Sequence, residues 1–99
     1  MAMATQQGSV GEIAYTIQVF KEDQFFVAHT LELDVSSQGR TVEEAKSHLR
    51  EAVEAFLEEA QRMNTLEDVL VEAGYQRTGQ GWKAPDLLAQ ERTTVALPR

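Results

Sequence analysis

Alternation of apolar and polar residues in the first third of the chain predicts three β-strands. The first, residues 12–20, places its larger apolar side chains at every second position, as on one face of a half-buried strand: Ile13, Tyr15, Ile17 and Val19. A short polar turn separates it from an aromatic and β-branched run at 25–31. A turn this short joins antiparallel neighbours, because a parallel crossover needs a dozen or more residues. A third, shorter strand is predicted at 35–38.

The hydrophobic period changes to three and four residues after position 41, which predicts one long amphipathic helix from about 41 to 62. Its apolar stripe consists of Val42, Ala45, Leu49, Ala52, Val53, Phe56, Leu57, Ala60 and Met63. Thr41 is a favoured N-cap residue, and Glu44 three positions later completes a capping box. Gly39 gives the backbone the freedom to turn sharply from the strand into the helix.

Shorter elements are predicted after the long helix. Thr65 is expected to cap a second helix that is ended by Gly74. A hairpin follows, with arms at 75–78 and 81–84, then one helical turn at 86–90. The last predicted strand comprises Thr93, Thr94, Val95, Ala96 and Leu97.

This order of elements predicts a two-layer α+β fold with an antiparallel β-β-β-α-β core, a second short helix and C-terminal strands. The apolar stripe of the long helix is expected to cover one face of the sheet. A single domain is predicted over residues 12–99, since a chain of 99 residues has room for one core. Residues 1–11 are small and polar, which indicates a disordered or cloning-derived lead.

Composition and charge limit the classes of function. The chain has no cysteine, which excludes disulfides and thiolate chemistry. No run approaches the ~18 apolar residues of a membrane helix, and no signal-peptide pattern precedes residue 12, so a cytoplasmic location is expected. With 16 acidic against 9 basic residues the net charge is −7, which disfavours binding to a phosphate backbone. The acidic excess favours either solubility or a basic partner.

The middle of the chain resembles the HicB-like antitoxin family. The matching segments are residues 15–17, the turn at 21–23, residues 26–28, and residues 33–45 with their Glu-Ala-rich continuation at 51–57. Ser37, Gly39, Thr41, Glu44 and Ala45 fit the family's pattern Ser-x-Gly-x-Thr-x-x-Glu-Ala. The resemblance extends from about residue 12 to residue 59, roughly half of the chain.

This resemblance implies a partial ribonuclease H-like fold without the catalytic acids of true ribonucleases H. It also implies binding to a small basic RNA-cleaving toxin whose active site the antitoxin covers. Many family members carry a C-terminal DNA-binding segment, but residues 66–99 contain no Lys/Arg-rich recognition helix. Direct binding to nucleic acid is therefore not expected, whereas a homo-oligomer, a dimer or a tetramer, is.

Several acidic and histidine side chains are candidates for catalysis, and each has a structural role as the alternative. A two-metal nuclease needs several converging carboxylates, and the candidates are Glu32, Asp34, Glu51, Glu54 and Glu58. The helical ones fall on the predicted solvent side, so no metal site is predicted. His29 is expected to be a partly buried, hydrogen-bonded strand residue, and His48 to pair with Glu44 one helical turn away. We predict no catalytic residue, no cofactor and no enzymatic activity.

The predicted interaction surfaces are two. Contacts to a protein partner are assigned to Glu32, Asp34, Glu51, Glu54, Tyr75 and Trp82. Tyr75 and Trp82 have the alternative role of core aromatics. The final strand, Thr93 to Leu97, is assigned to an oligomer edge, with completion of its own sheet as the alternative. The leading function is an antitoxin-like binding protein. One alternative is a stand-alone oligomeric domain with a structural or regulatory role, and another is a residual Mg²⁺-dependent nuclease.

Overall fold

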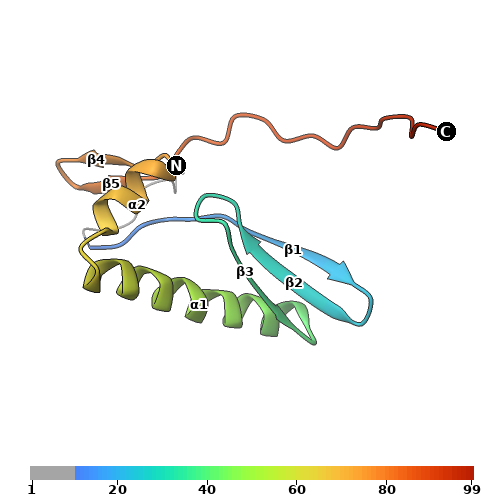
Figure 1. The fold of residues 1–99 in the computed structure, drawn as a ribbon, viewed down its shortest axis with the longest axis horizontal. Helices are drawn as coiled ribbons and strands as arrows, with labels where there is room; N and C mark the ends of the chain where they lie inside the picture. The colour runs from blue at the N-terminus through green and yellow to red at the C-terminus, as the bar shows by residue number, and fades with distance from the viewer. Residues whose placement is uncertain (1–10) are drawn as a thin grey trace, which may run out of the picture.

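The computed structural model describes residues 11–99 and has the predicted two-layer α+β architecture (Figure 1). Its main sheet contains β1 (Ile17–Glu22), β2 (Phe25–Thr30) and β3 (Val35–Gly39). All neighbours are antiparallel, and β2 lies in the centre. Val19 lies opposite Ala28, which in turn lies opposite Ser37. The order of strands in the sheet is thus their order in the chain.

The long helix α1 (Val42–Arg62) packs across one face of this sheet, chiefly against β3 and β2 (Figure 1). Ala45, Leu49 and Val53 are its buried positions over the sheet, and Ala28 and Thr30 are the fully buried residues of β2. The predicted helix is therefore confirmed, and its apolar stripe is confirmed in part, because Val42, Phe56 and Met63 are exposed. β1 lies farthest from the helix, and its inward side chains remain partly exposed.

The start of α1 is fixed by local hydrogen bonds and by close packing. Thr41 Oγ1 accepts a hydrogen bond from the Glu44 backbone N–H at 3.0 Å, and Glu44 Oε1 accepts one from the Arg40 N–H at 2.5 Å. The role of Gly39 differs from the predicted one. A Cβ at Gly39 would lie 2.6 Å from the backbone nitrogen of Ala45, so the position needs space rather than conformational freedom.

A smaller unit follows α1. It comprises α2 (Leu66–Glu72), β4 (Gln76–Thr78) and β5 (Gly81–Lys83), with β4 and β5 forming their own two-stranded sheet. The hairpin prediction is confirmed, but these strands do not extend the main sheet. Gly74, at φ +96°, follows α2 as predicted. Thr65 makes no side-chain cap of α2, and its hydroxyl instead donates to the Ala60 carbonyl at 3.3 Å.

Two predicted elements near the C-terminus are absent from this chain. Residues 84–99 contain neither the helical turn at 86–90 nor the strand comprising Thr93, Thr94, Val95, Ala96 and Leu97. The segment runs away from the rest of the molecule (Figure 1), and residues 86–99 are all exposed. A strand exists only where another strand supplies hydrogen bonds, and no strand within residues 11–99 pairs with this segment. The predicted lead lies outside the described residues except for Gly11.

Candidate functional site

Three exposed carboxylates of α1 form the clearest charged feature of the molecule. Glu51, Glu54 and Glu58 are spaced by three and four residues, which places them along one side of the helix. We call this set the acidic stripe. Its members make no ion pair within residues 11–99, whereas Glu43 and Glu59 of the same helix pair with Lys46 and Arg62.

Glu32 has a different position from the one expected of a partner contact. One carboxylate oxygen accepts from the Thr16 N–H at 2.9 Å and from the Thr30 hydroxyl at 3.2 Å. The other accepts from the Thr16 hydroxyl at 2.8 Å. Both oxygens thus accept hydrogen bonds within the chain. Through them Glu32 links the segment before β1 to the loop between β2 and β3.

Asp34 lies on the other side of the sheet from α1. His29 alternates with the buried residues Ala28 and Thr30, so its ring lies on the face away from the helix. Its Nε2 is 2.8 Å from Asp34 Oδ1, in an ion pair whose acid is almost fully exposed. The prediction of a partly buried, hydrogen-bonded histidine is confirmed. The structure therefore does not bring Asp34 together with the acidic stripe.

The predicted pair between His48 and Glu44 is wrong, because both side chains have other partners. The carboxylate of Glu44 is already used in the capping box at the start of α1. His48 Nδ1 instead donates to the Gln38 carbonyl at 2.7 Å, across the boundary between α1 and β3. Within residues 11–99 no group of three or more His, Asp or Glu side chains is arranged to hold a metal ion.

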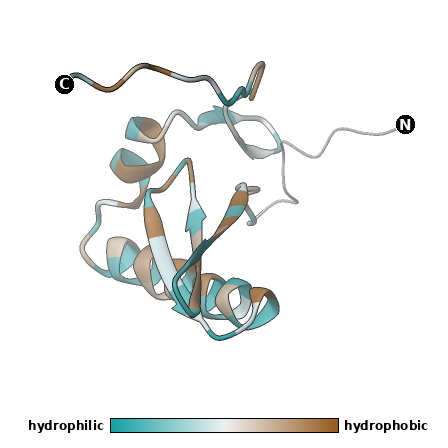
Figure 2. Cartoon of the chain, turned by 90° about the vertical axis from the view of Figure 1, so that its right-hand side faces the viewer, coloured by the Kyte–Doolittle hydropathy of each residue, from teal (hydrophilic) through white to brown (hydrophobic). Residues whose placement is uncertain are grey.

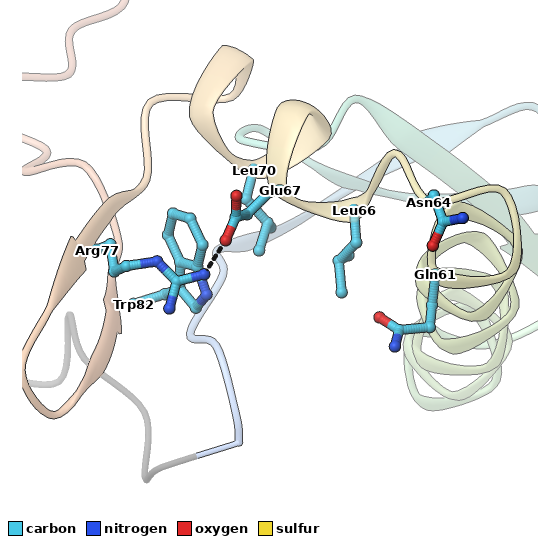
Figure 3. A pocket seen from close by; sticks show the side chains of 7 residues that line it. All are labelled: Gln61, Asn64, Leu66, Glu67, Leu70, Arg77 and Trp82. Atoms are coloured by element: carbon cyan, nitrogen blue, oxygen red, sulfur yellow. Dashed lines mark hydrogen bonds and ion pairs between the residues drawn. The ribbon is translucent and has the colours of Figure 1, made fainter.

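The two aromatic candidates have separate environments. Tyr75 lies in the core, and its hydroxyl donates to the Ala14 carbonyl at 2.6 Å. Burial is the main cause that raises the pKa of Tyr75 far above its usual value of 10.0. Trp82 is half-buried, with the Arg77 guanidinium 4.7 Å from its ring centroid. Arg77 in turn forms an ion pair with Glu67 of α2 (Figure 3).

A cavity of about 330 Å³ lies beside Trp82, between the end of α1, α2 and the hairpin (Figure 3). It is lined by Gln61, Asn64, Leu66, Glu67, Leu70, Arg77 and Trp82. Two amides, an ion pair and an indole ring offer hydrogen bonds and a stacking surface to a side chain of a partner. Sequence reasoning found Trp82 but not this cavity, because its walls come from three elements that are linked only by the tertiary fold.

Apolar side chains are exposed in two further places. Phe20 and Phe25 lie on the sheet face opposite α1, as their register with Val27 and Glu22 requires. Leu88, Val95 and Leu97 lie in the C-terminal segment, where hydrophobic positions stand out along the extended chain (Figure 2). No polar side-chain atom within residues 11–99 is buried without a hydrogen bond, so the unusual groups of this molecule are exposed apolar ones.

The fold and these surfaces define a small two-layer α+β domain with an acidic helix. Comparison of the chain with models of protein families, with curated proteins and with solved structures found no match. The resemblance to HicB-like antitoxins therefore rests on the motif in the sequence and stays a prediction. None of the helices within residues 11–99 is long and apolar enough to cross a membrane.

Proposed function

We propose that this protein is an antitoxin-like binding protein of the cytoplasm that captures a small basic RNA-cleaving toxin and covers its active surface. The observation that supports the proposal best is the acidic stripe, Glu51, Glu54 and Glu58, whose members make no ion pair within residues 11–99. In a chain of net charge −7, such a row attracts a basic surface over a distance of about 10 Å in moderate salt.

The contact residues of this proposal are Glu51 and Glu54, with Trp82 and its cavity as a second contact region. Charged groups at the rim of an interface act mainly on the rate of association, whereas a filled aromatic pocket acts on the rate of dissociation. Glu32 and Tyr75 serve the fold itself, since their polar atoms already have partners within the chain. Asp34 lies on the opposite face and is left out of this interface.

The first experiment captures the partner with the tagged full-length chain in a lysate of its native host. The expected product is a small basic protein, bound in stoichiometric amount at low salt and identified by mass spectrometry. Purified, that protein should cleave RNA, and one equivalent of the antitoxin-like chain should stop the cleavage. Recovery of the bait alone from cells that express every neighbouring open reading frame contradicts the proposal, as does a recovered protein whose RNA cleavage the chain leaves unchanged.

A matched pair of charge reversals then tests the acidic stripe. Glu54→Lys should lower the association rate roughly threefold to tenfold, whereas Glu22→Lys, the same change at the far end of β1, should leave it nearly unchanged. Dissociation rates of both variants should match the wild type. Stopped-flow association that stays constant from about 50 to about 500 mM salt would show that electrostatic steering plays no part.

A second candidate function is a stand-alone oligomeric domain whose only partner is itself. The exposed apolar side chains of residues 86–99 favour it. It predicts a stable oligomer and no basic protein in the capture experiment, so the same lysate separates the two functions.

A further inference from the structure

The C-terminal segment has the composition of a β-strand but is exposed to solvent. Leu88, Val95 and Leu97 are 84–90% exposed, and no hydrogen bond or ion pair holds residues 87–99 within the described part of the chain. Disordered tails are poor in large apolar and β-branched residues, because such residues gain nothing in water. Val95 and Leu97 alternate with Thr94 and Ala96, which is the pattern of one apolar strand face.

The main sheet has an edge strand, β1, whose length is close to that of the C-terminal segment. On the β3 side, α1 packs closely, and His48 Nδ1 already occupies the Gln38 carbonyl. β1 pairs with β2 on one side and with no strand within residues 11–99 on the other. Its inward residues Ile17 and Val19 contact the core while remaining partly exposed. An unpaired edge of this kind is the natural receptor for an added strand.

We propose that residues 91–97 form a fourth strand on the free edge of β1 in a second copy of this chain, and that the two copies exchange these segments reciprocally. Val95 and Leu97 then continue the apolar layer of Ile17 and Val19 beneath the sheet. Thr94 and Ala96 lie on the outer face beside Gln18. Each contact occurs twice about a two-fold axis, as in most homodimers.

Reach and charge both suit this exchange. The segment leaves the body at Pro85, and residues 86–97 in extended form span roughly 40 Å at about 3.3 Å per residue. The molecule measures 51 Å along its longest axis against 33 and 28 Å, and the C-terminal segment extends along that longest axis (Figure 1). Glu91, Arg92 and Arg99 leave it with little net charge, so the acidic body of a partner copy does not repel it. The exchange does not depend on the proposed toxin.

Disulfide trapping tests the exchange directly, because the chain has no cysteine of its own. Gln18→Cys is combined in turn with Thr93→Cys, Thr94→Cys, Val95→Cys or Ala96→Cys. Directly opposed residues on one face of a sheet bring their Cβ atoms to about 4.5–5.5 Å, close enough for a disulfide after a small backbone shift, whereas diagonal neighbours lie about 7–8 Å apart. We expect oxidised dimers chiefly with one of Thr94→Cys and Ala96→Cys, the one that lies directly opposite Gln18, and none with Thr93→Cys or Val95→Cys, which lie on the other face.

Non-reducing gel electrophoresis of the oxidised variants also shows whether the segment beside β1 comes from a second copy or from the same chain. A cross-linked species that migrates as a monomer would show that the segment folds back on its own chain, which overturns the proposal. Dimers that form equally at all four positions would indicate random collision and would also overturn it. Mixing Gln18→Cys chains with chains that carry only the cross-linking one of Thr94→Cys and Ala96→Cys should give mixed dimers, as exchange between copies requires.

Sedimentation equilibrium of the full-length chain supplies an independent measurement. The wild type should have twice the 11.1 kDa mass of one chain. Val95→Pro removes a backbone donor from the added strand and should weaken the dimer roughly tenfold or more, whereas Leu88→Pro, outside residues 91–97, should not. Both positions are free of contacts within the chain, so neither variant disturbs the monomer fold. A wild type that stays monomeric at every concentration would overturn the proposal.

Discussion

Two short stretches of similar sequence have opposite surroundings in this molecule. In β2, Val27-Ala28 lies between two antiparallel neighbours, and Ala28 is completely buried under α1. In the C-terminal segment, Val95-Ala96 has no strand beside it and is exposed to water. The comparison shows that β-propensity describes a fit to neighbouring strands rather than a property of the residues alone. A pattern therefore predicts that a strand can form, while the partner decides whether it does.

The largest expected effect separates the buried layer from the exposed segment. Leu49→Ala removes a fully buried side chain between α1 and the sheet and should lower the free energy of unfolding by about 2–5 kcal/mol. Val95→Ala removes an apolar side chain of similar kind from the exposed segment, and at concentrations where the chain is monomeric it should change that energy by less than about 0.5 kcal/mol. Urea unfolding followed by circular dichroism measures both. Equal losses would mean that residues 93–97 are buried in the monomer.

A smaller effect is expected where β3 meets α1. Gly39→Ala places a Cβ 2.6 Å from the Ala45 nitrogen, and relief of this overlap requires the helix start to move. The cost should be about 1–3 kcal/mol, as for other overpacked sites. Gly79→Ala is the matched control, since nothing lies within 4 Å of its added Cβ. If thermal unfolding of Gly39→Ala matches that of the control, the close approach of strand and helix is not what stabilises this junction.

The smallest effect is expected at the hydrogen bond that joins Tyr75 to the segment before β1. Tyr75→Phe removes the hydrogen bond to the Ala14 carbonyl and should cost about 0.5–1.5 kcal/mol at neutral pH.

The same residue gives the fold a dependence on alkaline pH. Burial raises the pKa of Tyr75 above the usual 10.0, so the folded chain retains a proton that the unfolded chain releases. Stability should therefore be intact below pH 10 and fall as pH rises beyond it. Tyr75→Phe should show a shallower decline, and the part that remains belongs to Tyr15, whose pKa burial also raises. A wild type and variant with identical profiles up to pH 12 would exclude this linkage.

The sequence predicted the elements that rely on local signals. The hairpin of β1 and β2, the start of α1 at Thr41 and the short hairpin after α2 all depend on contacts a few residues apart. Side-chain pairings between distant residues carry no such local signal. Glu32 binds Thr16, sixteen residues away, and such a pairing leaves no periodic trace in the sequence.

Of the candidate functional surfaces, those set by spacing within one helix could be predicted from the sequence, and those built from several elements could not. The acidic stripe follows from helical spacing, and the structure places it as that spacing implies. The cavity at Trp82 and the bond between His48 and Gln38 do not follow from spacing, because each depends on how separate elements pack. Thr93 to Leu97 had the right pattern and lacked a neighbour in its own chain.

The agreement between strand order and chain order has a consequence for synthesis on the ribosome. β1, β2, β3 and α1 are neighbours both in space and in sequence, so their contacts close short loops and should form quickly. A nascent chain can complete this sheet and helix once residue 62 has emerged. The bond from Tyr75 to Ala14 forms later, and residues 91–97 emerge later still. Each chain would then present a finished β1 edge before it has a C-terminal segment to place there.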